Sequence, residues 1–452
     1  MASDSCGRPL PCPDGSSTAR AATRKEKGLA VHLFTILAAL LGLTAVFGVV
    51  NERYLRLPSS IGLMLLALLM TFALAGLKSI GFVAALGWEE TLVRELDLSN
   101  VLLNGVLSFM LFAGSTGVEI ERLRKRRWII LSLAIGSTPL ACALIGVLLS
   151  SSLGWFGVTL ALSYAFVFGA LISPTDPIAA LAILKGAGLP KPLATIITGE
   201  SLFNDGVGVV LFTLALSLSQ GSAQESVTHG GVLFLREVLG GIGLGLLVGF
   251  AAHHALVRTK DYGNQLLITL STVALGYSVA LHVDVSGPIA MVVVGLIVGN
   301  LSMPRLSTGL RVPLQAFWLG IDEILNSLLF VMIGFIVILV HDLPWAPLSV
   351  SIPGAIVVCL LARAVSVYVP IAALNTTRRL DADSFGMTKL LTWGGLRGGL
   401  ALALALSLPE SPEKPLILNM TFGVVAFSIL VQGSTIGKLF KPSYLQGLMK
   451  SG

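Results

Sequence analysis

Charged side chains are scarce in this 452-residue sequence, in which Asp, Glu, Lys and Arg make up only 12% of the residues. A soluble domain typically carries about 25% charged residues. Hydrophobic residues account for 54% of the chain, and the mean hydropathy is +0.88. A polar stripe recurring every 3.6 residues is also missing, which excludes a soluble all-helical protein.

Cysteine is rare as well, and its positions exclude a disulfide framework or a cysteine metal site. Cys142 and Cys359 lie in apolar segments, whereas Cys6 and Cys12 lie near the N-terminus. These last two can pair if they face an oxidising compartment, but two free thiols are the favoured interpretation. The net charge of +6 does not indicate a nucleic-acid partner, because the basic residues sit in short loops. No cofactor is expected.

Long apolar runs dominate the chain and predict an all-α integral membrane protein, since a membrane helix needs about 20 apolar residues. The thirteen predicted spans run roughly over residues 29–50, 59–77, 100–118, 128–150, 157–184, 192–219, 231–257, 265–283, 286–300, 315–340, 353–374, 386–407 and 415–437. Residues 1–28 are rich in Ser, Pro, Gly and charge and are predicted to be a disordered tail. The run from Leu29 to Val50 is too long for a signal peptide and lacks a cleavage site, so we expect a retained helix.

The distribution of Lys and Arg predicts how the chain is oriented in the cell (inner or plasma) membrane. Loops after odd-numbered spans and the C-terminal tail hold most of the loop Lys and Arg, whereas loops after even-numbered spans hold only Lys78, Arg94 and Lys414. The C-terminus is therefore predicted to be cytoplasmic, and thirteen spans then place the N-terminus outside. Basic residues in the N-terminal tail disagree, but the other loops agree with one another and decide the prediction.

Two predicted spans are interrupted by helix-breaking residues. Pro174 and Pro177 bracket Thr175 and Asp176 in the fifth span, and four glycines surround Leu396 and Arg397 in the twelfth. Broken helices in matching halves of a chain are typical of transporters built from two inverted repeats. The repeats would be spans one to six and eight to thirteen, with the seventh as the link. Such breaks are tolerated at membrane depth only where they are buried or line a cavity.

Few charged residues lie within the spans, where each costs about 2.5–3.5 kcal/mol on insertion scales and is usually functional. At about 100° per residue, Glu200, Ser201, Asn204 and Asp205 present oxygen to one side of the sixth span. Small hard cations prefer oxygen ligands, and unwound backbone at Thr175 would add carbonyls. A polar helix–helix contact is the alternative, but two carboxylates within one and a half turns favour a functional site.

The remaining charges predict how the site is balanced. A buried arginine needs a carboxylate partner, and we pair Arg363 with Glu200, which leaves Asp205 as the titrating group. The pairing of Arg363 with Asp205 stays open. Asp176 and Arg397, one in each break, are predicted to compensate the charges of half-helix ends rather than to bind cation. The set Asp322, Glu323 and Asn326 fits either a cytoplasmic entry or a helix N-terminal position.

The run SPTDPIAALAILKGAGLPKPLATIITGESLFNDGVGVVLF resembles the monovalent cation:proton antiporter family, in its NhaP-type sodium/proton exchanger branch. The resemblance extends to DVSGPIAMVVVGLIVGN, to LNSLLFVMIGF, to Arg363 in its apolar segment and to GGLRGGLALALAL, and it covers almost the whole chain after the tail. One departure is Ala113, where several relatives have an acid in the third helix.

This resemblance implies thirteen helices, with unwound helices five and twelve crossing each other. It implies a mobile core of helices four to six (128–219) and eleven to thirteen (353–437). The scaffold would be helices one to three (29–118) and eight to ten (265–340), with helix seven (231–257) as the link and residues 438–452 as a short cytoplasmic tail. A homodimer formed through the scaffold is also implied.

The resemblance also implies roles for the site residues. Asp205 of the Asn204–Asp205 pair would exchange cation for proton, Thr175 would offer a carbonyl or hydroxyl, and Ser201 a hydroxyl. Glu200 would pair with Arg363. The predicted function is therefore electroneutral one-for-one exchange of Na⁺, with Li⁺ or K⁺ as alternatives, for H⁺ by alternating access.

Several other functions are alternatives to this prediction. They are a K⁺/H⁺ exchanger or sodium-coupled organic anion transporter on the same architecture, an intramembrane aspartyl protease, and a channel. The protease is disfavoured because NDG is not the GxGD motif. We therefore predict a transporter with a role in pH homeostasis rather than an enzyme.

Overall fold

The computed structural model describes residues 35, 38–79, 105–155, 157–186, 188–220, 227–336, 345–377 and 383–448, and these are almost entirely helical. Within this part of the chain, nine helices are long and apolar enough to cross a membrane. Shorter apolar helices lie at Ser59–Ala73, Leu107–Thr116 and Leu162–Ile172. The prediction of an all-α membrane protein is confirmed. The predicted tail 1–28, with Cys6 and Cys12, and the loop residue Arg94 lie outside the described residues.

Each predicted span contains helical segments. The helix in the first predicted span is described from Ala38 to Leu55. In the first half of the chain the elements are η1 (Asn51–Leu55), α2 (Ser59–Ser79), α5 (Leu107–Thr116), α6 (Ile120–Lys125), α7 (Arg127–Leu131), η4 (Ser132–Ser137), α8 (Thr138–Trp155), α9 (Leu162–Ile172), α10 (Pro177–Gly186) and α11 (Lys191–Ser219). The link and second half contain α12 (Val227–Arg258), α13 (Tyr262–His282), α14 (Gly287–Ile297), η5 (Val298–Ser302), η6 (Met303–Arg305), α15 (Thr308–Ile336), α16 (Trp345–Thr376), α17 (Ser384–Trp393), α18 (Gly399–Leu406), α19 (Lys414–Phe427), η8 (Ser428–Gly433), α20 (Ser434–Leu439) and α21 (Pro442–Gly447).

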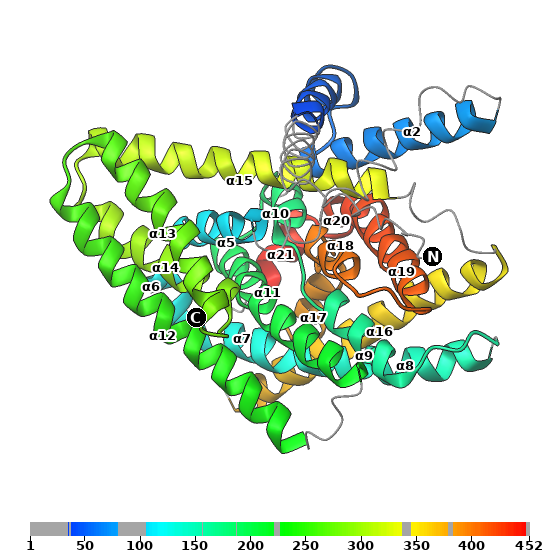
Figure 1. The fold of residues 1–452 in the computed structure, drawn as a ribbon. Coiled ribbons are helices and arrows are strands. Elements are labelled where there is room, and N and C mark those ends of the chain that lie inside the picture. The colour runs from blue at the N-terminus through cyan, green and yellow to red at the C-terminus, as the bar shows by residue number, and fades with distance from the viewer. Residues whose placement is uncertain are drawn as a thin grey trace, which may run out of the picture.

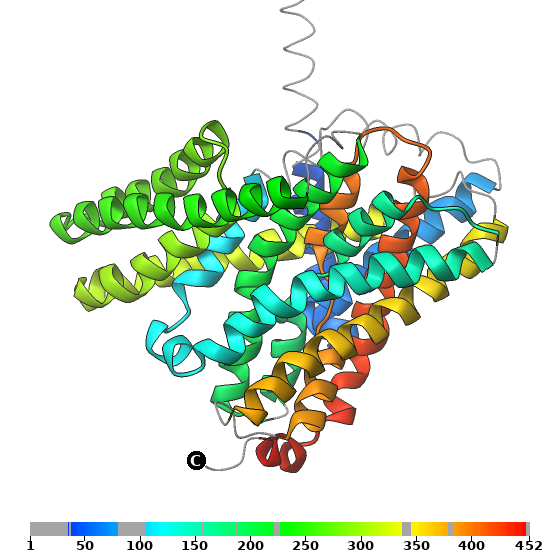
Figure 2. The same ribbon diagram turned by 90° about the horizontal axis from the view of Figure 1, so that it is seen from below.

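The helices pack in two groups (Figure 1). One group contains α2, α5 and α12 to α15, and α15 runs along it from α13 to α2. The other contains α8 to α11 and α16 to α20, with α10 and α11 near the centre of the molecule. Seen after a 90° turn, α12 and α13 again lie on one side and α8, α16 and α19 on the other (Figure 2).

Small residues let the helices of the first group approach closely. On α12, Gly241, Gly245 and Gly249 are spaced four residues apart and lie against α14, so that a Cβ at Gly245 would be 2.8 Å from the carbonyl oxygen of Ala290. Gly295 of α14 lies in the same way against α5, close to the side chain of Ser115 and the backbone of Phe112. Stripes of small residues at this spacing are typical of helix contacts in membranes, where apolar surface alone gives little drive to associate.

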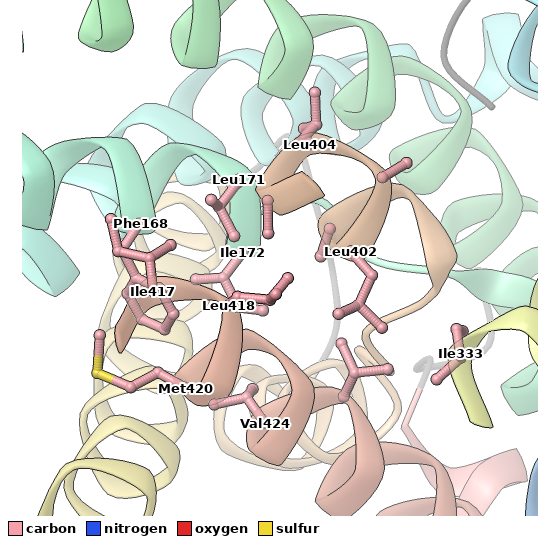
Figure 3. Packing of buried hydrophobic residues seen from close by; sticks show 14 of the residues in the cluster. Phe168, Leu171, Ile172, Ile333, Leu402, Leu404, Ile417, Leu418, Met420 and Val424 are labelled. Atoms are coloured by element: carbon pink, nitrogen blue, oxygen red, sulfur yellow. The ribbon is translucent and has the colours of Figure 1, made fainter. Parts of the chain in front are cut away.

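Apolar side chains of α9, α18 and α19 fill the centre of the second group (Figure 3). Phe168, Leu171 and Ile172 of α9 lie against Ile417 and neighbouring residues of α19, and all are almost fully buried. The packing holds the ends of two half-helices, α9 and α18, side by side. This packing therefore positions the helix breaks of both interrupted spans.

The predicted fifth and twelfth spans are each two half-helices joined by non-helical backbone. Helix α9 ends at Ile172 and α10 begins at Pro177, whereas α17 ends at Trp393 and α18 begins at Gly399. Proline at positions 174 and 177 removes backbone donors, and glycine at 394, 395 and 398 weakens helix formation. The two extended pieces meet in one antiparallel bridge, in which the Asp176 N–H donates to the Leu396 carbonyl at 2.7 Å.

Candidate ion-binding site

Arg397 occupies the break of the twelfth span and faces the break of the fifth. Its Nη1 donates to the carbonyl of Ser173, and to that of Pro174 at 2.9 Å. Its own backbone N–H donates to Ser428 Oγ at 2.8 Å. The Ser173 and Pro174 carbonyls follow the C-terminal end of α9, where a helix leaves acceptors unsatisfied and carries negative partial charge. A buried guanidinium therefore balances this half-helix end.

Asp176 stands at the start of the opposite half-helix. It directly precedes Pro177, the first residue of α10, and it also lies beside the start of α18. A Cβ at Gly398 would come within 2.6 Å of Asp176 Oδ2, so a glycine is needed for this close approach. The carboxylate thus sits near the N-terminal ends of two half-helices, which carry positive partial charge.

Hydrogen bonds join α11 to the break of the fifth span. The Ser201 hydroxyl donates to the Thr175 carbonyl. Asn204 Nδ2 donates to Thr175 Oγ1 at 2.9 Å, and the Thr175 N–H donates to Asn204 Oδ1 at 3.4 Å. All three side chains are buried. Asn204 therefore holds the unwound segment, and it is not among the residues that line the cavity described below.

Glu200 forms an ion pair with Arg363, as predicted, and the alternative pair of Arg363 with Asp205 is not formed. Arg363 Nη2 lies 2.5 Å from Glu200 Oε1, and both side chains are at most 3% exposed. The same Nη2 donates to the Leu391 carbonyl at 3.4 Å. The ion pair joins α11 to α16, and this hydrogen bond ties α16 to α17. Among the described residues, no basic side chain lies within ion-pair distance of Asp205.

A cavity of about 310 Å³ brings most of the predicted site residues together. Its polar side chains come from Thr175, Asp176, Thr198, Ser201, Asp205, Asp322 and Asn326. The three aspartates are each partly exposed, unlike the neighbouring ion pair. Glu200, Arg363 and Arg397 do not line the cavity. The site can thus offer carboxylate, hydroxyl and carbonyl oxygen to a small cation, which is the ligand set such ions prefer.

The chain matches the family model described as sodium/hydrogen exchanger, transmembrane, over residues 36–441. It belongs to the sodium/hydrogen exchanger family. The Na(+)/H(+) antiporter NhaP of Pseudomonas aeruginosa is 40% identical over 426 residues, which cover 93% of this chain and 99% of that protein. The Na(+)/H(+) antiporter NhaH of Halobacillus dabanensis is 31% identical over 397 residues, covering 86% and 93%. The membership confirms the family named from the motifs.

The fold of this exchanger is also similar to a solved one. The sodium proton antiporter MjNhaP1 from Methanocaldococcus jannaschii superposes with a TM-score of 0.72 over 93% of this chain and 100% of that chain, at 19% identity. This likeness shows the fold. It agrees with the all-helical membrane architecture expected from the apolar runs.

Two features of this exchanger were not resolved from its sequence. Asp322 lines the cavity, whereas the sequence left it between a cavity wall and a helix N-terminal position. Ser428, which binds the Arg397 backbone, was not singled out at all. One serine in an apolar helix is a common helix contact, so nothing in its local sequence marks this role. Ala113 on α5 is 4% exposed and does not line the cavity.

Proposed function

We propose that the protein is a secondary active antiporter that exchanges Na⁺ for H⁺, with Asp205 as the group that carries both. The observation that carries this proposal is the contrast between two carboxylates on one helix. Glu200 is buried and paired with Arg363, whereas Asp205 lines a cavity beside unwound backbone. The two similar proteins NhaP and NhaH are named as Na(+)/H(+) antiporters, which supports the same function.

Asp205 would carry one monovalent cation or one proton, and in both cases the site is neutral. The empty site keeps an uncompensated charge, which is costly to move through a low-dielectric region. Exchange is therefore coupled, electroneutral and one-for-one, and cation and proton compete for the carboxylate. Asp176 and Arg397 stay as compensating charges at the half-helix ends.

The other ligands follow from the hydrogen bonds. The Ser201 hydroxyl donates a hydrogen bond to the Thr175 carbonyl, so the lone pairs of the Ser201 oxygen are available to a cation. Thr175 contributes its carbonyl or hydroxyl oxygen next to Asp205. Asn204 donates to the Thr175 hydroxyl from outside the cavity lining and acts as a positioning residue. The cation is thus transported substrate, bound by Asp205, Ser201 and Thr175.

Alternating access would come from movement between the two groups of helices. We assign spans four to six (128–219) and eleven to thirteen (353–437) to a moving core. Spans one to three (29–118) and eight to ten (265–340) form the scaffold and the homodimer contact, with 231–257 as the link. The packing of α8 to α11 with α16 to α20 supports this division.

The state described here would be open to the cytoplasm. From Asp205, the cavity extends along α11 to Thr198 and along α5 to Gly117 and Val118. The positions of Lys and Arg assign these ends of α11 and α5 to the cytoplasmic side, together with the C-terminus, and the N-terminus to the outside. We infer an inward-facing conformation in the cell membrane.

A K⁺/H⁺ exchanger would use the same oxygen ligands and remains the main alternative in substrate. A sodium-coupled organic anion transporter is disfavoured by a specific observation. An anion needs basic groups in the cavity, yet Arg363 is paired with Glu200 and Arg397 donates to backbone carbonyls. Neither arginine is a lining residue.

Proteoliposomes that report internal pH test the proposal. The purified protein should move protons when Na⁺, Li⁺ or K⁺ gradients are imposed, and the ranking of the three ions identifies the substrate. An organic anion gradient should have no effect. Absence of proton movement with all three cations would contradict antiport.

A further inference from the structure

A third carboxylate faces the cavity, and the one-carboxylate exchange step does not use it. Asp322 lines the same cavity as Asp176 and Asp205 but comes from α15. Helix α15 packs against α2 and α5, and Thr71 Oγ1 of α2 donates to the Gly334 carbonyl of α15 at 3.0 Å. Asp322 therefore belongs to the group of helices opposite the one that holds Asp205.

A neighbouring amide holds Asp322 in place. Asn326 lies one turn further along α15 and also lines the cavity, with 7% of its surface exposed. Its Nδ2 donates to the Asp322 carbonyl at 2.8 Å and to Asp322 Oδ1 at 3.2 Å. The carboxylate is thus fixed to its own helix rather than to the half-helices across the cavity.

The other helix on this wall offers no charge. Helix α5 lines the cavity with Leu107, Met110, Leu111 and Gly114, and the residues Gly117 and Val118 follow it. Among the described residues, Asp322 is therefore the one acid on the α5 and α15 wall of the cavity. An apolar wall with a single fixed charge concentrates the field of that charge, and such fields raise the local concentration of counter-ions.

We propose that Asp322 is an entry residue, which draws cations from the cytoplasm to Asp205 and acts on that side of the membrane alone. This assignment rests on the proposed exchange function and on the inward-facing orientation. Because α15 stays with the scaffold, Asp205 leaves Asp322 behind when the core moves to face outside. The outward-facing site then binds cation without help from Asp322.

The next residue provides a matched control. Glu323 carries the same charge but is exposed and lines a different cavity, of about 520 Å³, together with Glu52 and Arg56. One position along a helix turns the side chain by about 100°, which accounts for the separation. Glu323→Gln removes one negative charge at nearly the same depth without touching the Asp205 cavity.

The test compares the two sides of the membrane in everted and right-side-out vesicles. Asp322→Asn should raise the cytoplasmic KM for Na⁺ by about threefold to tenfold and leave the outside KM and the maximal rate close to wild type. Asp322→Glu should restore most of the cytoplasmic affinity. Added choline chloride should shrink the difference between wild type and Asp322→Asn, because salt screens a steering charge. Glu323→Gln should behave like wild type.

Each outcome separates this role from the exchange function itself. An equal rise of KM on both sides, or a fall in maximal rate with unchanged KM, would show that Asp322 is structural. A cytoplasmic KM that matches wild type would overturn the entry role while leaving antiport intact. If the wild-type protein exchanges no cation for protons in the same vesicles, while Asp205→Asn gives the same trace, the proposed function and the entry role both fail.

Discussion

Asp176 and Leu396 come from opposite halves of the chain and join the two unwound segments through a single hydrogen bond, from the Asp176 N–H to the Leu396 carbonyl at 2.7 Å. Arg397, the next residue, reaches back to the carbonyls of Ser173 and Pro174. Each break thus satisfies backbone groups left open in the other. The two breaks therefore form one hydrogen-bonded unit, and Asp176 of this unit lines the same cavity as Asp205.

Replacing Asp205 by Asn should abolish exchange while the protein still inserts and purifies. Asparagine keeps the size of the side chain but can neither carry a proton nor neutralise a cation. Proton flux driven by Na⁺ in proteoliposomes is the measurement, and Glu121→Gln, a change at an exposed acid of α6, is the control. Flux by Asp205→Asn at a rate near wild type would show that another group carries the ions.

Arg363→Ala should destabilise the protein more than Asp205→Ala does. Removing one partner of a buried ion pair strands the other charge and costs about 3–5 kcal/mol. Thermal unfolding of the detergent-solubilised variants measures the difference. The double change Glu200→Gln with Arg363→Met should recover part of the loss, because it removes both charges. A double variant no more stable than the worse single one would mean that the pair does not act as a unit.

Gly398→Ala should slow exchange, because the added Cβ would lie 2.6 Å from Asp176 Oδ2 and force the carboxylate or the break to shift. Overpacking of this kind costs about 1–3 kcal/mol. Gly354→Ala on α16 is the matched control, since a Cβ there meets nothing within 4 Å. Transport rate and thermal stability should both fall for Gly398→Ala, whereas neither should fall for the control, because alanine favours a helix interior over glycine. Equal transport rates and stabilities of the two variants would argue against a close contact between Gly398 and Asp176.

Transport should be electroneutral, because one carboxylate carries either one cation or one proton across. The exchange rate in proteoliposomes should therefore not change when the membrane potential is clamped at different values. Li⁺ and Na⁺ gradients should give the same result. A steep voltage dependence, or a reversal point set by two protons per cation, would mean that a second acid titrates.

Acidification should weaken apparent cation binding without lowering the maximal rate at saturating cation. The sign follows from competition: below the pKa of Asp205 the proton occupies the carboxylate, and above it the cation has access. KM for Na⁺ measured at a series of pH values should rise as pH falls. A KM independent of pH, with a maximal rate that drops instead, would place proton and cation on different groups.

The sequence by itself determined the features that depend on neighbouring residues. Apolar runs too long for a soluble core identify membrane helices, and proline or glycine inside such a run interrupts it wherever the chain folds. The positions of both breaks and the family membership follow from motifs of this local kind. The presence of Glu200 and Asp205 on one helix also marked α11 as the centre of the site.

Only the tertiary structure decided which groups meet. Glu200 and Asp205 are both within reach of an arginine on sequence grounds, and the rotation of α11 against α16 gives Arg363 to Glu200. The rotation of α11 also directs Asn204 to Thr175 and away from the cavity. On α15, the rotation of the helix directs Asp322 into this cavity and Glu323 into a different one. Helix rotation depends on packing between segments far apart in the chain, such as the glycine stripe of α12 on α14. The order of residues along one helix carries no information about that packing.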